Sequence, residues 1–157
     1  PWLYEIDELG FNFRLSDISA ALGISQLQKL DKFIKYRQEI AKKYNESLSE
    51  IHELKLPDLK PNRTHAYHLY VLRINFKKLK KNKFDLFKLF LKNKIKLQVH
   101  YIPIFLQPYF KKNYKIKHKD FQNTMDYYEE AFSIPIYYGL KNETIFKVNK
   151  LLKKFLG

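Results

Sequence analysis

The sequence has no cysteine and very little glycine, and both shortages narrow what the chain can do. Without cysteine there are no disulfides and no thiolate metal ligands. Such a chain suits a reducing compartment, and we expect it to work in the cytoplasm. Only four glycines occur among 157 residues, and they build no glycine-rich loop of the kind that holds phosphates.

Long apolar runs are missing as well. No stretch comes near the roughly 20 apolar residues that a membrane span needs, and no signal-peptide pattern is present. The five histidines are scattered without metal-ligand spacing, and no order of serine, histidine and aspartate indicates a nucleophilic triad. Residue patterns alone therefore predict neither a membrane contact, a metal site nor a particular reaction.

Positive charge is abundant, but arginine is scarce. The formal net charge is +14, and 30 residues are basic. Only four of these are arginines, namely Arg14, Arg37, Arg63 and Arg73. Proteins that read phosphates usually recruit arginine for its bidentate fork, and here lysines are spread through every segment. We interpret the charge as a diffuse basic surface and expect no specific nucleic-acid partner.

The hydrophobic content of 45% and the aromatic content of 17% indicate a globular chain of one domain. Its clearest element is a long amphipathic helix expected over 16–49, with Ser16 as its N-cap and Asp17 at the positive end of the helix dipole. We expect its apolar stripe to lie in the core. The stripe consists of Leu27, Leu30, Ile34, Ala41, Tyr44 and Leu48.

Shorter elements complete an α+β fold, which we expect to be a small, mainly antiparallel sheet with helices on one face. An extended lead-in over 1–14 precedes the long helix. The remaining patterns predict strands at 66–74, 97–101 and 133–136, helices at 83–93 and 120–131, a turn or short helix from Pro108, and a final helix capped by Asn142.

One local pattern favours a different function. Residues 17–25 resemble the first helix and turn of a helix-turn-helix DNA reader. The register of that pattern fails, because Ser19 and Lys29 stand where the motif has a small residue such as alanine and an apolar residue. A basic nucleic-acid-binding domain nevertheless stays open as an alternative, and so does a non-catalytic dimerisation domain.

Several collinear segments together resemble the DegT/StrS family of sugar aminotransferases. They are Trp2 to Glu5, Leu9 to Ile18, Ala20 to Leu27, His68 to Tyr70, Val99 to Pro103, Leu106 to Tyr109 and Ser133 to Ile136. The resemblance is greatest to the transaminases of pseudaminic acid biosynthesis, which aminate a UDP-linked 4-keto sugar. It covers nearly the whole chain.

This resemblance implies a pyridoxal-phosphate-dependent enzyme with the aspartate-aminotransferase fold (fold type I), acting as a homodimer on a sugar nucleotide with glutamate as amino donor. Residues 1–15 would be the tail of a large cofactor-binding domain, and residues 16–157 the C-terminal small domain. The family's serine-x-histidine-x-x-lysine element, which supplies the catalytic lysine, is absent from the sequence. We therefore expect this chain to be inactive by itself.

The resemblance also implies site residues. Asn12 and Arg14 match the positions that reach the cofactor phosphate of the neighbouring subunit, and an amide and a cation suit a phosphate near a helix start. His100 and Tyr101 match a loop near the sugar nucleotide. Their alternative role is a packed core histidine and tyrosine. Phe105 departs from the family, whose members often have a polar residue or histidine there.

Overall fold

The computed structural model describes residue 5 and residues 7–157, apart from the side chain of His118. Of the expected lead-in, residues 1–4 and 6 lie outside this description. The chain divides into two compact units, Pro1–Lys32 and Phe33–Gly157.

The first unit contains an irregular segment over 7–16 and the start of helix α1, which runs from Asp17–Leu48. The Ser16 hydroxyl accepts from the Ser19 amide at 3.3 Å, as expected for an N-cap. Gly23 lies inside the helix without ending it. Because a helix-turn-helix needs a turn at this glycine, the resemblance of residues 17–25 to a DNA reader does not extend to the backbone.

The apolar stripe of α1 is only partly buried. Ala41, Tyr44 and Leu48 lie in the core as expected, but Leu27 and Leu30 remain 68% and 45% exposed. The prediction for those two leucines is wrong for this chain. Helical periodicity identifies an apolar face, but it does not say whether the surface that covers this face belongs to the same chain.

The second unit is built on a three-stranded antiparallel sheet with the order β1-β2-β3. The strands are β1 (Leu54–Lys55), β2 (Tyr70–Ile74) and β3 (Ala131–Ile134). Tyr70 pairs with Ile134 and Arg73 with Ala131 across the two longer strands. The strand expected at 97–101 is reduced to one antiparallel bridge between Gln98 and Ser133.

Further helices follow α1 in this unit. They are α2 (Lys83–Lys92), the short 3₁₀ helix η1 (Ile104–Leu106), α3 (Pro108–Asn113), the 3₁₀ helix η2 (His118–Phe121), α4 (Gln122–Glu130) and α5 (Asn142–Leu156). The Asn82 side chain caps α2 by accepting from the Phe84 amide at 2.8 Å. At α5 the expected cap is wrong, because Lys141 is the N-cap and the Asn142 side chain instead accepts from Lys43 Nζ at 2.8 Å.

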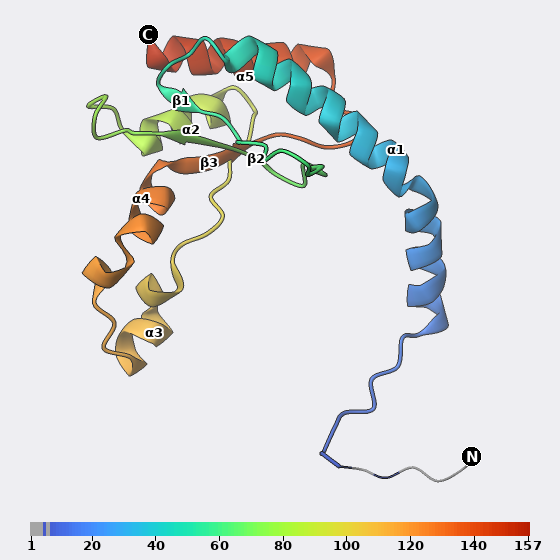
Figure 1. The fold of residues 1–157 in the computed structure, drawn as a ribbon. Coiled ribbons are helices and arrows are strands. Elements are labelled where there is room, and N and C mark those ends of the chain that lie inside the picture. The colour runs from blue at the N-terminus through green and yellow to red at the C-terminus, as the bar shows by residue number, and fades with distance from the viewer. Residues whose placement is uncertain (1–4, 6) are drawn as a thin grey trace. The chain divides into compact units, whose positions relative to one another are not determined.

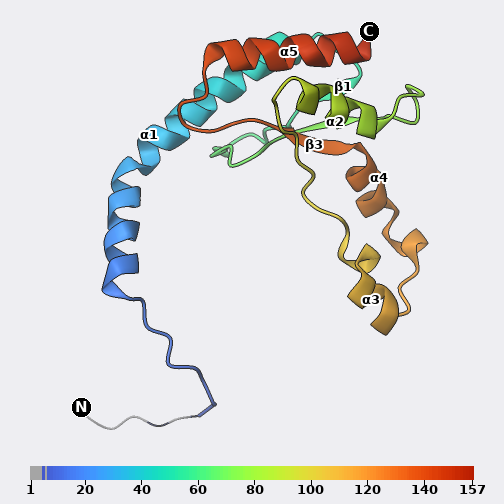
Figure 2. The same ribbon diagram turned by 180° about the vertical axis from the view of Figure 1, so that it is seen from behind.

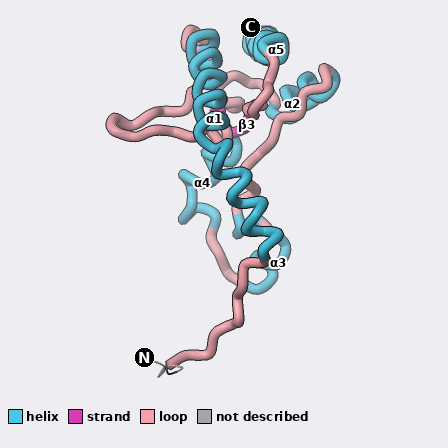
Figure 3. The backbone as a smooth tube through the Cα atoms, turned by 90° about the vertical axis from the view of Figure 1, so that its right-hand side faces the viewer, coloured by secondary structure: helices cyan, strands magenta, loops and turns pink. Residues whose placement is uncertain are grey.

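The core of this unit lies between the sheet and its helices. Figure 1 shows α5 and the second half of α1 along the same side of the sheet, and Figure 3 shows the two helices next to each other. The chain around α3 extends from the opposite side (Figures 1 and 2). Two fully buried tyrosines tie α1 to the rest: Tyr44 donates to the Pro135 carbonyl at 3.0 Å, and Tyr70 donates to Asn45 Oδ1.

Arg37 of α1 fastens the segments at the ends of β2 and β3. One of its guanidinium nitrogens donates to the carbonyls of Tyr67, His68 and Ile136, at 3.0, 3.1 and 3.3 Å. Such charge-assisted bonds to backbone are stronger than neutral ones. They hold the chain before β2 against the chain after β3.

Candidate functional site

The first pair of candidate residues lies just before α1. Asn12 and Arg14 are both exposed on the irregular segment that leads into the helix. Arg14 donates to the carbonyl of Phe13 at 3.2 Å. Among the described residues, no hydrogen-bond partner is found for the Asn12 amide. The guanidinium carries five donors and the amide two more, so most of this donor set stays available to an anion.

The second pair lies after the Gln98 bridge. His100 is half-buried, and its Nε2 lies 2.9 Å from the hydroxyl of Ser133. Its Nδ1 is buried and has no hydrogen-bond partner among the described residues. A buried unpaired nitrogen costs free energy, so this ring atom is an unsatisfied polar group of the kind that calls for an explanation.

Tyr101 differs from its neighbour. Its ring stands edge-on to His100, with centroids 4.9 Å apart, but the residue is 77% exposed. The alternative of a packed core tyrosine is therefore wrong for this chain. Phe105, by contrast, is buried and stacks on Phe121, with ring centroids 5.2 Å apart, so this side chain serves packing.

Ser133 is a site residue that sequence reasoning did not single out. It is the one polar side chain among the buried residues of the described chain, and it lies in β3. Its hydroxyl is within 3.4 Å of the Gln98 carbonyl as well as bonded to His100. A serine inside the apolar run 131–136 was the available signal, but its partner is 33 residues away and follows only from the strand pairing.

Lys83, at the start of α2, is a partly buried cation next to the beginning of β3. Its Nζ donates to the carbonyls of Tyr128 and Ala131, both at 2.7 Å, where α4 ends and β3 begins. Burial lowers the pKa of this lysine to about 8, while the Glu129 carboxylate acts in the opposite direction. Lys83 also lines an apolar cavity of about 430 Å³ together with Val99.

The two predicted pairs belong to different units. His100 and Tyr101 lie together in the second unit, with Ser133 beside them. Asn12 and Arg14 belong to the first unit. The arrangement supplies hydrogen-bond donors, an exposed phenol and an imidazole, which are groups that bind hydroxyls and phosphates.

Known proteins match nearly the whole chain. The model of the DegT/DnrJ/EryC1/StrS aminotransferase family matches residues 2–153. The spore coat polysaccharide biosynthesis protein SpsC of Bacillus subtilis is 34% identical over 92% of this chain and 37% of its own length. The UDP-4-amino-4,6-dideoxy-N-acetyl-beta-L-altrosamine transaminase of Campylobacter jejuni is 31% identical over 98% of this chain and 42% of its own length.

A solved structure of an aminotransferase resembles this chain as well. Helicobacter pylori PseC, described as an aminotransferase involved in the biosynthesis of pseudoaminic acid, superimposes with a TM-score of 0.83. It is 27% identical, and the match covers 98% of this chain and 41% of PseC. The fold is thus that of a type I aminotransferase. The chain belongs to the DegT/DnrJ/EryC1/StrS aminotransferase family, since that family's model spans all but a few of its residues.

The likeness is partial in one respect. The chain spans 37% of the length of SpsC and 42% of the length of the Campylobacter jejuni transaminase.

Among the described residues, no helix is both long and apolar enough to cross a membrane.

Proposed function

We propose that this chain is the C-terminal portion of a pyridoxal-phosphate-dependent aminotransferase that moves an amino group, with glutamate as donor, onto a keto sugar nucleotide. The observation that carries the proposal is the family match over residues 2–153. The transaminase relative from Campylobacter jejuni and the likeness to PseC favour a UDP-linked 4-keto sugar as the acceptor. The enzyme would work in the cytoplasm as a homodimer.

The donor set at the start of α1 fits the cofactor's phosphate. Asn12 and Arg14 offer an amide and a cation on exposed backbone, close to the N-terminal end of a 32-residue helix. Phosphates bind favourably at such places. When bound, pyridoxal phosphate supplies the electron sink that amino transfer needs. In this proposal Asn12 and Arg14 hold its phosphate group and do not touch the reacting atoms.

His100 and Tyr101 are proposed to bind the sugar nucleotide. The exposed phenol of Tyr101 is free to donate to a hydroxyl or phosphate oxygen. Ser133 fixes the imidazole through its 2.9 Å bond to Nε2, and Nδ1 is a buried ring atom without a hydrogen-bond partner among the described residues. Ser133 is therefore a positioning residue for His100.

Exposed apolar side chains support the view that more of the protein packs against the first unit. Large hydrophobic residues between 9 and 30 are left uncovered, including Phe11, Phe13, Leu22 and Leu27. Monomeric proteins rarely expose apolar patches of this extent. We propose that this face packs against the portion that the relatives have and this chain does not, with residues 1–15 as the connection and 16–157 as the small domain.

The experiment is an amino-transfer assay on the complete protein with glutamate and a UDP-linked 4-keto sugar, following 2-oxoglutarate. Tyr101→Phe should raise KM for the sugar nucleotide about tenfold with little change in kcat, because it removes one bond to the bound substrate. Tyr109→Phe, another exposed tyrosine of the same segment, is the matched control. Failure to form 2-oxoglutarate with any keto sugar nucleotide would refute the proposal.

A second test uses the chain alone. Because the sequence lacks the family's lysine element, mixing the chain with pyridoxal phosphate and then borohydride should give only sparse labelling spread over many lysines. A stoichiometric, reducible adduct on a single lysine would contradict the assignment of this chain as a portion without the catalytic lysine.

A further inference from the structure

A second cavity in the Phe33–Gly157 unit is lined by basic side chains and adjoins the proposed substrate residues through Ser133, which lines it and is bonded to His100. It has a volume of about 360 Å³, within the range of small-molecule sites. Three chain segments and α5 form its walls. The polar residues that line it are His68, Lys94, Lys96, Gln98, Ser133, Tyr137 and Thr144.

The charged side chains that line this basic cavity are all of one sign, positive. Two ammonium groups and an imidazole line it, and none of its lining residues, all of them described, is acidic. Arg37 adds a further cation behind the wall, bound to the carbonyls of His68 and Ile136. A concave surface with charge of one sign concentrates the field and attracts ions of the opposite sign. The basic cavity is therefore suited to an anion.

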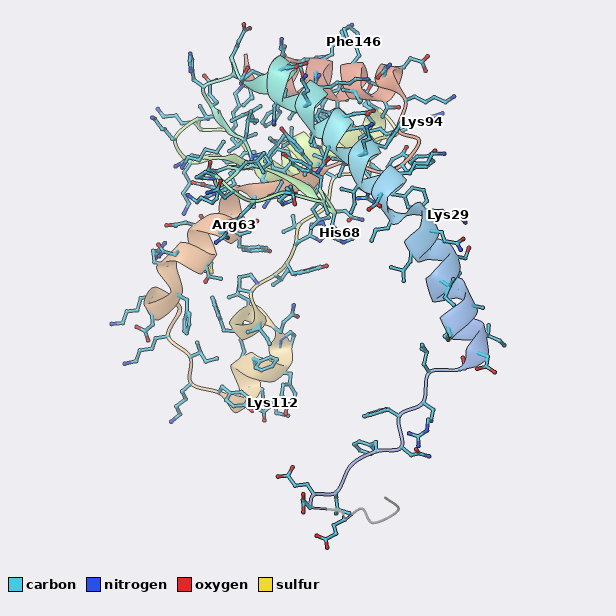
Figure 4. The ribbon with its side chains drawn as sticks, turned by 45° about the vertical axis from the view of Figure 1, so that its right-hand side comes forward. Lys29, Arg63, His68, Lys94, Lys112 and Phe146 are labelled. Atoms are coloured by element: carbon cyan, nitrogen blue, oxygen red, sulfur yellow. The ribbon has the colours of Figure 1, made fainter. Side chains whose placement is uncertain are left out.

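The walls are held by hydrogen bonds, so the shape does not depend on a ligand. The Gln98 bridge to Ser133 has N–O distances of 2.8 and 3.3 Å. The turn that carries the two lysines is fixed where α2 ends: the Ile95 amide donates to the Phe90 carbonyl at 3.0 Å, and Lys147 of α5 donates to the Asn93 carbonyl at 2.8 Å. Figure 4 labels His68 and Lys94, which belong to two different segments of the lining.

The turn also places both lysines at the cavity. Ile95 is buried with only 7% exposure, while Lys94 and Lys96 on either side of it are exposed. Because Ile95 is anchored in the core, the positions that the side chains of Lys94 and Lys96 can reach are limited. Apolar residues form the remaining wall, among them Leu69, Ile134 and Pro135. The lining thus combines cations with an apolar surface that accepts an organic group.

We propose that the basic cavity binds a small organic phosphate at a site that shares only Ser133 with the residues assigned to amino transfer. The ammonium groups of Lys94 and Lys96 hold the phosphate, Thr144 and Tyr137 donate to its oxygens, and the apolar wall contacts the organic part. This site goes beyond the proposed function, and it uses neither Asn12, Arg14 nor Tyr101.

The test is calorimetric titration of the 157-residue chain with uridine 5′-monophosphate at low salt, with uridine and inorganic phosphate as comparison ligands. We expect one saturable site for the monophosphate, weaker binding of inorganic phosphate and none of uridine. Lys94→Gln combined with Lys96→Gln should weaken binding about tenfold or more. Lys78→Gln combined with Lys80→Gln removes the same charge from a turn outside the cavity and should leave the affinity nearly unchanged.

Three outcomes would overturn the proposal. Equal loss in the two lysine pairs would show that general positive charge attracts the ligand. Inorganic phosphate binding as tightly as the monophosphate would show that the organic group has no site. Loss of binding in Arg14→Gln or in Tyr101→Phe would place the phosphate at the start of α1 or at the proposed substrate residues instead. Because none of these measurements involves amino transfer, they are independent of the proposed activity.

Discussion

Within α1 the same apolar spacing meets two different surroundings. In the first unit, Leu22 and Leu27 are 62% and 68% exposed, whereas Tyr44 and Leu48 in the second unit are fully buried. The helix does not change its pattern between them. What changes is the presence of β2, β3 and α5, which cover the second half. The comparison teaches that the second unit has its own core, while the apolar face of the first is exposed.

Positive charge is also distributed unevenly between the two units. Residues 1–32 hold three of the 30 basic residues and five of the 16 acidic ones, so the positive charge belongs to residues 33–157. The segment that resembles a DNA reader therefore lies in the part of the chain with the least positive charge. This separation weakens the nucleic-acid alternative further, since phosphate binding needs the cations on the reading element.

The largest expected effect contrasts two leucines. Leu72 is fully buried in β2, so Leu72→Ala should lower the free energy of unfolding of the chain by about 2–5 kcal/mol. Leu27→Ala makes the same change at an exposed position of α1 and should alter it by less than about 0.5 kcal/mol. Urea unfolding followed by circular dichroism measures both.

The same pair in the complete protein sharpens the comparison. If the exposed face of the first unit is covered there, Leu27→Ala should become strongly destabilising while the effect of Leu72→Ala stays as it was. A Leu27→Ala effect that remains small in the complete protein would contradict the proposal that this face is an internal interface.

Much of the second unit could be predicted from the sequence, because local patterns specify it. The helix expected at 83–93 and the long helix were both correct. The exposure of Leu27, the two-residue strand β1 and the bond between His100 and Ser133 could not be predicted. Each depends on contacts between residues far apart in the chain or on surfaces outside it, and no local spacing encodes these.

The second prediction concerns the charge of Phe33–Gly157. Duplex DNA should bind the chain weakly and without sequence preference, and the affinity should fall at least about a hundredfold between 50 and 200 mM salt, as about four phosphate contacts would give. Fluorescence anisotropy with two unrelated duplexes measures this. Sequence-selective binding that survives 150 mM salt, and that is lost on changing residues 17–25, would restore the helix-turn-helix interpretation.

The third prediction tests the functional role proposed for the first unit. In the complete enzyme, Asn12→Ala should weaken cofactor retention about tenfold to a hundredfold, the effect of losing one charge-assisted bond. Stability should change little, because Asn12 is exposed. Gln28→Ala, at another exposed amide of the same unit, should leave retention unchanged. Equilibrium dialysis of the cofactor gives the affinity.

Mixed dimers decide which subunit Asn12 serves. An Asn12→Ala subunit paired with one lacking the catalytic lysine places both lesions in one active site if Asn12 acts on the neighbouring subunit. The other site is then intact, and part of the wild-type activity should return. If both parents and the mixed dimers are inactive, Asn12 acts within its own subunit and the assignment across the dimer is wrong.

The smallest expected effect comes from Lys83, a partly buried lysine of the second unit. Burial lowers its pKa to about 8 from an ordinary value of 10.5, so between these values the unfolded chain binds a proton that the folded chain lacks. Stability should therefore rise with pH from about 8. Above pH 10 it should fall, because burial raises the pKa of Tyr44 and Tyr70 above the ordinary value of 10.0 and the unfolded chain then loses its protons first.

Lys83→Arg separates this contribution from all others, since arginine stays charged throughout the range. Because Lys83 is only half-buried, solvent screens the penalty, and the rise between pH 8 and 10 should not exceed about 1 kcal/mol. Urea unfolding at pH 7, 8, 9 and 10 should show this rise in the wild type and in Lys88→Arg, an exposed position of the same helix, but not in Lys83→Arg. An unchanged pH profile in Lys83→Arg would mean that the ammonium at the carbonyls of Tyr128 and Ala131 is as well solvated as a surface lysine, and that this end of α4 is open to water in solution.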